Sequence, residues 1–336
     1  MPTPVLDTVV RRPDLGGAIV EMFEASGSMG YIGTQLLPIQ NVNENAGVYP
    51  VITKESLMKN VNPARAPKSA YVRTNYDYER GSYMTYEYGV EEVIDDVERS
   101  LFDQEAGGMA DMLAAKRAAN YLMRAQEKRI ANLFFSTTAA ARFGTTSITN
   151  EWDDYANATP ISDIKAQLNT FRLKAGNAPD ALVVNWEVYN NLTQCAQIVD
   201  QIKYTFGAAL DIRNLSAAQV AQALGVPRLI VAGGLEDTAG QGLDSSISDI
   251  WSNEYAALVR IGDMTSGGLG RTFSWAPESG SPFVVEQYRE NAVRGDVYRV
   301  RHYVGETLYA SVEADNTTIL SDVANDNIIL FDNVTT

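Results

Sequence analysis

The longest helical stretch of the chain constrains its fold more than any other feature. Residues 106–135 contain no proline and, after Gly108, no glycine, so little within them breaks a helix. At about 1.5 Å rise per residue, this helix would be roughly 40 Å long, and we interpret it as a strut that supports smaller layers. One face is apolar at helical spacing and a different face is mainly basic. The apolar face holds Met112, Ala115, Ala119, Leu122, Ile130, Leu133 and Phe134, and the other holds Arg117, Tyr121, Arg124 and Lys128.

The charge around this helix is uneven. Residues 87–105 contain eight acids and one base, whereas residues 106–135 contain five bases and two acids. One interpretation is a solvated pair of segments, because exposed charge pairs contribute little stability. The alternative is complementarity between copies of the same chain. In that case the contact residues are Glu91, Glu92, Asp95 and Asp96 on the acidic side, and Arg117, Arg124 and Lys128 on the basic side.

Composition narrows the class of protein. The chain has 336 residues, a net charge of −15 and one cysteine, Cys195. This length allows one large domain or two closely joined domains with a substantial core. The negative net charge disfavours tight wrapping on DNA, because neutralising phosphates requires Lys and Arg. An acidic protein could still enclose DNA. The lone cysteine fits a reducing compartment, and the absence of a signal-peptide core or membrane-length apolar run predicts a soluble protein made in the cytosol.

The first 88 residues predict an arm followed by a long hairpin. Residues 1–35 are rich in proline, have a weak helix near 16–25 and end in GSMGYIG, which we interpret as a flexible joint. In residues 36–88, GVYPVITKES leads out, a tip with Arg65 and Lys68 follows, and YVRTNYDYERGSYMTYEY leads back. A two-stranded arm is marginally stable alone. It therefore packs either on its own domain or on a partner, and tyrosine on one face of the return strand suits an interface. In the second case Arg65 and Lys68 are the contact residues at the tip.

From about residue 178 the pattern changes to buried strands that alternate with short helices. ALVVN (181–185) and RLIVAGG (228–234) predict buried strands. We expect one helix over 186–199 and another that Ser216 caps and Gly225 ends. This order predicts a compact α/β layer. Before it, Ser162 is expected to cap a helix over 163–174, and after it residues 283–312 predict long antiparallel strands that could return to the long helix.

Residues that could support catalysis are few. His302, the only histidine, lies in an alternating strand pattern and is predicted to be a core or interface residue. Cys195 is predicted to be a small buried hydrophobe. The chain has no G-x-S-x-G elbow and no Gly-Lys phosphate loop, and one Cys with one His cannot form a usual zinc site. EEVIDDVE could bind a divalent ion, but consecutive acids on a helix point to different faces. We therefore predict no enzyme activity, no cofactor and no metal.

The order of these parts resembles the tailed-bacteriophage major capsid proteins of the Hong Kong ninety-seven type. The acidic YGVEEVIDDVE turn and the long helix follow the hairpin; next come PDALVVNWEVYNNL and LGVPRLIVAGG, and then IWSNEYAALVRI, LGRTFSW and VEQYRENAVRGDVYRVRHYVGE. The resemblance covers roughly residues 30–320. It implies an α+β fold with an N-terminal arm (1–35), an extended hairpin loop (36–88), a peripheral domain with the spine helix (89–177 and 284–336) and an axial domain (178–283).

The resemblance also implies a function. Members of this family assemble as hexamers and pentamers into an icosahedral shell around double-stranded DNA. The implied partners are copies of the chain, a portal protein and, as further candidates, scaffolding or decoration proteins. The protein would be made in the host cytoplasm, reside in the virion capsid and enclose DNA without specific binding. Some members crosslink a hairpin lysine to a neighbour's asparagine, but Lys59 and Lys68 match such a lysine by location only.

Two alternatives stay open. An encapsulin-like compartment uses the same fold to store an enzyme, and the length of the chain and its acidic C-terminal tail disfavour it. A metabolic enzyme with an α/β domain is disfavoured by the scarcity of catalytic residues. Electron microscopy of the purified protein would separate the enzyme from the two shells, and the contents of the shell would separate the capsid from the compartment.

Overall fold

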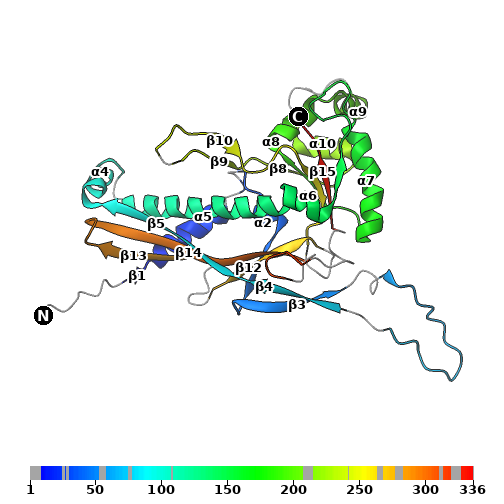
Figure 1. Ribbon diagram of the computed structural model, residues 1–336, viewed down its shortest axis with the longest axis horizontal. Helices are drawn as coiled ribbons and strands as arrows, with labels where there is room; N and C mark the ends of the chain where they lie inside the picture. The colour runs from blue at the N-terminus through cyan, green and yellow to red at the C-terminus, as the bar shows by residue number, and fades with distance from the viewer. Residues whose placement is uncertain are drawn as a thin grey trace.

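The computed structural model describes residues 9–24, 27, 30–52, 58–74, 78–106, 109–206, 215–240, 242–262, 268–276, 283–309, 313–318 and 327–335. The molecule is elongated, and the long helix α5 (Ala110–Phe134) crosses most of its length beside a six-stranded sheet (Figure 1). A compartment built on a five-stranded sheet stands at one end of α5, and a hairpin arm projects from the body below that end. The fold is α+β, as predicted.

Helix α5 matches the predicted spine but begins four residues later than expected. Its predicted apolar face is buried at Ala115, Ala119, Leu122, Ile130 and Phe134, and Met112 and Leu133 are half-buried. The alanines present little side-chain bulk, so the helix can lie close to the strands it covers. The segment preceding it, α4 (Asp96–Ala106), is joined to it by an ion pair between Arg99 and Asp111.

The six-stranded sheet is organised by its longest strand, β14 (Gly295–Leu308). The order is β1–β13–β14–β12–β2, and β5 also pairs with β14. β5 covers residues 295–304 of β14, while β13 and then β12 occupy the other edge in turn. The remaining bounds are β1 (Val10–Arg11), β2 (Ile39–Val42), β5 (Tyr86–Asp95), β12 (Gly270–Trp275) and β13 (Val284–Glu290).

The N-terminal segment lies across this sheet, as predicted for a segment without its own core. Helix α1 (Pro13–Glu24) buries Leu15 and Ile19 in a cluster with α5, β13 and β14. The interpretation of GSMGYIG as a flexible joint is wrong for residues 30–33. Tyr31, Ile32 and Gly33 are buried there, and Gly33 begins the short helix α2 (Gly33–Leu36). Residues 28 and 29 lie outside the described residues.

The acidic segment that sequence reasoning treated as helical is mainly a strand. Residues 86–95 pair with β14 along their whole length, so Glu91 and Glu92 point to opposite faces of a sheet, and the helix begins only at Asp96. A ten-residue ladder with a neighbouring strand overrides the weak local preference of Glu for helix.

The hairpin arm consists of β3 (Ala46–Ile52) and β4 (Tyr78–Met84), which pair antiparallel. Tyr49 lies opposite Gly81 and Tyr83 opposite Gly47, and each ring lies over the glycine of the partner strand, where a Cβ would collide with it. Both rings also stack on Phe273 of β12. The base of the arm therefore packs on its own domain, which was one of the two predicted alternatives.

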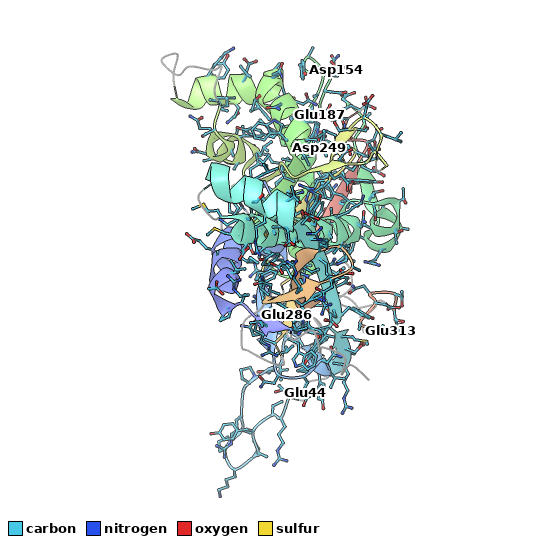
Figure 2. The ribbon with its side chains drawn as sticks, turned by 90° about the vertical axis from the view of Figure 1, so that its left-hand side faces the viewer. Glu44, Asp154, Glu187, Asp249, Glu286 and Glu313 are labelled. Carbon is cyan, nitrogen blue, oxygen red and sulfur yellow. The ribbon has the colours of Figure 1, made fainter. Side chains whose placement is uncertain are left out.

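Beyond its base the arm leaves the body. In Figure 2 it extends past Glu44 as an open loop whose side chains point outward. Residues 58–74 are exposed except for the half-buried Val61. The predicted return strand does not include residues 71–74, and Tyr76 lies outside the described residues. This loop has no buried core of its own.

The five-stranded sheet has the order β6–β15–β11–β7–β8. Every residue of β7 (Ala181–Asn185) and β11 (Ala256–Val259) is buried, as expected for strands covered on both faces. One face meets α5 and α6 (Thr137–Phe143), and the other carries the short helices. The remaining elements are β6 (Thr145–Ser147), β8 (Leu229–Ala232), β15 (Ile328–Asp332), α7 (Pro160–Ala175), α8 (Trp186–Gln194), α9 (Ala196–Phe206) and α10 (Ala217–Leu224).

The capping residues in the sequence predicted both ends of α10 correctly, but the predicted boundaries of two other helices were wrong. Ser216 caps α10 in a capping box with Gln219, and Gly225 ends it in the left-handed conformation. Helix α7 begins at Pro160, not after Ser162, because proline suits the first turn of a helix. The single helix expected over 186–199 is broken at Cys195, whose thiol contacts the carbonyl oxygen of Trp152 at 3.2 Å.

Strand pairing crosses two of the predicted domain boundaries. β6, α7 and β15 join the five-stranded sheet, although they fall in the ranges expected for the peripheral domain. β12 falls in the range expected for the axial domain but pairs with β14. The reason for the second difference is that β14 is twice as long as β13 and needs a second neighbour beyond Arg301.

Candidate assembly surfaces

The basic side chains of α5 differ in how far their own chain satisfies them. Arg117 pairs with Glu92 at 3.1 Å, and Lys128 pairs with Glu236 at 2.7 Å. Arg124 has no hydrogen bond or ion pair among the described residues, and its Nε is buried without a partner. A guanidinium group carries five N–H donors, so Arg124 is the member of this predicted set most open to an external carboxylate.

Arg124 lies in a shallow cavity on the outer side of α5. Arg117, Asn120, Tyr121 and Arg124 line a volume of about 160 Å³. Asn120, Tyr121 and Arg124 follow Arg117 by three, four and seven residues, so all four lie on one side of the helix. Tyr121 is exposed there, so the cavity offers an aromatic ring beside two guanidinium groups, a combination that protein interfaces favour.

The predicted acidic residues have partners in their own chain. Glu91 pairs with Arg299 at 2.6 Å, and Asp96 binds Arg289 through two hydrogen bonds of 2.6 and 2.7 Å. These bonds lower the pKa of the Asp96 carboxyl below its usual range. The Asp95 side chain accepts a hydrogen bond from the backbone N–H of Val97 at the start of α4. These acids therefore hold the sheet and α4 in place, whatever further contacts they make.

The pairs extend into a row of alternating charge across three strands. Arg299 lies between Glu91 and Glu286, and Arg301 lies between Glu286 and Glu87. Opposite charges on neighbouring strands stabilise a sheet by roughly 0.2–1 kcal/mol per pair. The acidic excess for which sequence reasoning considered contacts between copies is thus partly neutralised within β5, β14 and β13.

At the tip of the arm, the two predicted contact residues have different environments. The Nε of Arg65 donates to the carbonyl oxygen of Ser69 at 2.5 Å, and its guanidinium lies 4.6 Å from the ring centroid of Tyr71. Lys68 has a positive φ of 68° and an exposed side chain without an ion pair among the described residues. Arg65 therefore orders the loop, and Lys68 is presented outward from it.

The residues considered for catalysis are buried in apolar surroundings, as predicted. His302 is 1 % exposed and packs against Phe283 and Tyr88; burial and the nearby Arg129 lower its pKa to about 3. Burial raises the pKa of the Cys195 thiol to about 12. Within the described residues, no group of three or more His, Cys, Asp or Glu side chains could hold a metal, and no helix is long and apolar enough to cross a membrane.

Sequence reasoning missed Glu127, which is the most deeply buried acid among the residues that the structure describes. Its carboxylate accepts hydrogen bonds from the backbone N–H groups of Ile32 and Gly33 and from the indole N–H of Trp251, at 2.7–2.9 Å. Burial raises the pKa of Glu127, and the three donated bonds oppose that rise. The carboxylate thus joins α5 to the segment that leads into the arm and to the loop after β10 (Ile247–Asp249). An acid on the row shared with Met123 and Ile130 was the signal that could have revealed it.

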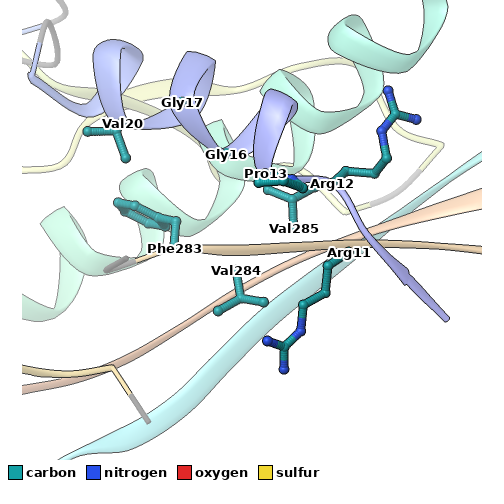
Figure 3. A pocket seen from close by; sticks show the side chains of 9 residues that line it. All are labelled: Arg11, Arg12, Pro13, Gly16, Gly17, Val20, Phe283, Val284 and Val285. Carbon is teal, nitrogen blue, oxygen red and sulfur yellow. The ribbon is translucent and has the colours of Figure 1, made fainter. Parts of the chain in front are cut away.

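A second cavity, of about 210 Å³, lies between α1 and β13 (Figure 3). Val20 and Phe283 face each other across it, and the side chain of Arg12 points away from it. Arg12 is bound to Asp14 and Gln287. The cavity is therefore an apolar hollow beside the N-terminal segment, and its lining has no group suited to catalysis.

Solved structures of low sequence identity share this architecture over almost the whole chain. A phage-related protein from Bordetella bronchiseptica RB50 superposes with a TM-score of 0.63 at 15 % identity, covering 97 % of this chain and 98 % of that one. A putative capsid protein of an Escherichia coli CFT073 prophage gives a TM-score of 0.52 at 11 % identity, with 97 % and 99 % covered. A protein of Microbacterium phage Oxtober96 gives 0.56 at 10 % identity, with 90 % and 91 % covered.

The chain has the Hong Kong ninety-seven capsid fold. The resemblance drawn from the order of sequence blocks is therefore confirmed. No family model matches the chain. One curated relative, the major capsid protein of Burkholderia phage BcepMu, is 26 % identical over 178 residues, which are 52 % of this chain and 56 % of that protein. The chain thus spans a little over half the length of the curated relative it matches.

Proposed function

We propose that this protein is a structural major capsid protein. In this proposal it assembles as hexamers and pentamers into an icosahedral shell that encloses double-stranded DNA, and it catalyses no reaction. The observation that carries the proposal is a capsid fold over 97 % of the chain, combined with an arm whose tip has no core of its own. The curated relative, a major capsid protein, supports the same role.

The geometry supports self-assembly more than binding of a small molecule. The tip of the arm leaves the neighbouring side chains of Tyr71 and Val72 largely in solvent, and an adjoining apolar surface of this kind suits contact with another protein surface. The titratable residues that catalysis would need, His302 and Cys195, lie in the core. A portal protein and scaffolding or decoration proteins are further proposed partners, and the virion capsid is the proposed location.

The proposed domains follow the strand pairing of the two sheets. The five-stranded sheet and its helices would form the axial domain, and α5 with the six-stranded sheet would form the peripheral domain. Of the predicted contact residues, Lys68 and Arg124 have neither an ion pair nor a side-chain hydrogen bond among the described residues, so they are the first candidates for contacts between subunits. The other predicted contact residues could contribute only through contacts beyond those they make within their own chain. They are Arg65, Arg117, Lys128, Glu91, Glu92, Asp95 and Asp96.

Electron microscopy and sedimentation of the purified full chain test this function. Closed shells that sediment far faster than a 36.8 kDa monomer are expected. A protein that stays monomeric across protein concentration and salt would contradict the proposal. Particles recovered from the producing cells should contain nuclease-resistant double-stranded DNA. An enclosed protein in its place would instead identify a storage compartment of the same fold.

A further inference from the structure

The tip of the arm is a basic surface on an acidic protein. Residues 58–74 contain Lys59, Arg65, Lys68 and Arg73 and no acid, in a chain with a net charge of −15. Tyr71 is 73 % exposed and Val72 is 55 % exposed beside these bases. Ser69 and Arg65 order the loop through bonds within it, so little conformational freedom remains to be lost there on docking. The tip thus suits an acidic surface that also offers apolar side chains.

A second protruding hairpin has the opposite character. β9 (Leu235–Asp237) pairs with β10, and residues 235–249 contain Glu236, Asp237, Asp244 and Asp249 and no base. Leu243 and Ile247 are 74 % and 61 % exposed. Asp237 accepts hydrogen bonds from the backbone N–H groups of Ala239 and Ser246, which orders the turn. We call residues 235–249 the acidic hairpin.

The acidic hairpin carries a larger share of unpaired acids than the described side chains of β5 and α4, where Asp95 and Glu98 lack an ion pair. Glu236 pairs with Lys128, but Asp237, Asp244 and Asp249 have no ion pair among the described residues. On β5 and α4, by contrast, Glu91, Glu92 and Asp96 are each paired with an arginine of their own chain. Unpaired carboxylates beside exposed aliphatic side chains complement the charge and the apolar side chains of the tip.

One chain cannot bring these two surfaces together. In Figure 1 the arm and the acidic hairpin extend from the body in opposite directions, and in Figure 2 Asp249 lies on the side of the body away from the arm. The base of the arm is fixed by Tyr49 and Tyr83 on Phe273, and Lys128 holds Glu236 beside α5. A contact between tip and acidic hairpin must therefore join two copies.

We propose that the tip of the arm docks on the acidic hairpin of a neighbouring copy. This inference rests on the proposed function and specifies which surface receives the arm. Lys59, Lys68 and Arg73 face the carboxylates of Asp244 and Asp249, and Tyr71 and Val72 cover Leu243 and Ile247. Charge sets the register of the two loops, and burial of the four apolar side chains stabilises the contact.

Cysteine crosslinking tests the contact directly. The only native cysteine, Cys195, is fully buried, so it should not form crosslinks of its own. Lys68→Cys and Asp244→Cys are made in separate chains, which are mixed, assembled and oxidised. A crosslinked dimer on a non-reducing gel is expected. The matched control pairs Lys68→Cys with Glu98→Cys, an exposed acid on α4, and should give no dimer.

Three results would overturn the proposal, and they are distinguishable. Shells without a Lys68–Asp244 crosslink would refute the docking partner and leave the capsid function standing. A crosslink to position 98 in place of 244 would assign the tip to α4. Absence of shells from the unmodified chain would remove the proposed function itself, and this contact with it. A crosslink at 244 that disappears when Asp249→Lys and Asp237→Asn are added would support the role of charge.

Discussion

The hairpin arm and the five-stranded sheet show two opposite ways of using apolar side chains. In the sheet, Leu182, Val184 and Leu258 are fully buried beneath the helices that cover the face away from α5. In the arm beyond its base, Tyr71 and Val72 stand in solvent. The sheet buries its apolar area on folding, whereas the arm can bury its own only on meeting another surface.

This difference separates folding from assembly within one chain. A change in the five-stranded sheet should alter the free energy of unfolding of each subunit. A change at the tip should leave that free energy unchanged and alter only the association of subunits. Glu127 should affect both folding and assembly, because it fixes the segment that leads into the arm to the spine helix.

Removing the tip should have the largest effect on assembly. If Asn60–Ser69 is replaced by two glycines, closed shells should be lost and free subunits or loose capsomers should remain. The free energy of unfolding should change by less than about 0.5 kcal/mol, since these residues have no buried contacts with the body. Sedimentation and circular dichroism measure the two effects. Intact shells would show that the tip is not a clamp, and loss of helical signal would show that it belongs to the fold.

A matched pair of aromatic truncations should show the contrast in stability. Phe331 on β15 is fully buried, so Phe331→Ala should lower the free energy of unfolding by about 3–5 kcal/mol. Tyr71→Ala removes a similar ring from the tip and should change it by less than about 0.5 kcal/mol. Urea denaturation of the dissociated subunits measures both. Equal costs for the two variants would mean that the tip is part of the folded core.

Removing the carboxylate of Glu127 should loosen the root of the arm. Glu127→Ala leaves the N–H groups of Ile32, Gly33 and Trp251 without an acceptor and should cost about 2–4 kcal/mol. Glu127→Gln keeps one acceptor oxygen and should cost less. Hydrogen exchange at the Ile32 and Gly33 amides should accelerate most in the alanine variant. Unchanged exchange there would contradict the proposed anchoring.

Glu127 also predicts a pH dependence. Its pKa is raised in the folded state by burial, so the folded protein binds this proton more tightly than the unfolded chain does. Its contribution to the free energy of unfolding is therefore fullest below the unfolded-state pKa and declines as pH rises through the folded-state pKa. The stability of the unmodified protein relative to Glu127→Gln should fall over that interval. A rise would mean that the three donated hydrogen bonds outweigh burial.

Two serine substitutions should show the same contrast between the folded body and the tip, with smaller changes in the free energy of unfolding. Ser216 caps α10 through the backbone N–H of Gln219, so Ser216→Ala should cost about 1 kcal/mol. Ser69 makes a local bond to the carbonyl oxygen of Ala66 in the tip, and Ser69→Ala should leave the free energy of unfolding nearly unchanged. Thermal unfolding of both variants provides the comparison, and a lower midpoint for Ser69→Ala would contradict it.

A change at Arg124 on the spine helix should affect assembly more than folding, as a change at the tip of the arm should. Since it has no partner in its own chain among the described residues, Arg124→Glu should change the free energy of unfolding by about 1 kcal/mol or less and should lower the yield of shells. A compensating change of an acid to a base should restore part of the yield. Normal yield from the single variant would exclude Arg124 from the contact between copies.

The sequence by itself determined the elements whose signals are local. The apolar repeat of residues 110–134 specified the spine helix, and Ser216 with Gly225 specified both ends of α10. The burial of His302 followed from its alternating strand pattern, and the burial of Cys195 followed from the usual behaviour of a free cysteine. The order of these elements indicated the capsid fold, because the same succession of helices and strands is packed in the same way.

The tertiary structure alone decided features that depend on residues far apart in the chain. Residues 86–95 became a strand because β14 offered a partner two hundred residues away. Glu92 and Arg117, assigned by sequence to contacts between copies, met within one chain because β5 lies under α5. Glu127 became buried because Ile32 and Trp251 converge on it. Local propensity is worth tenths of a kcal/mol per residue, so a long-range ladder or a buried carboxylate outweighs it.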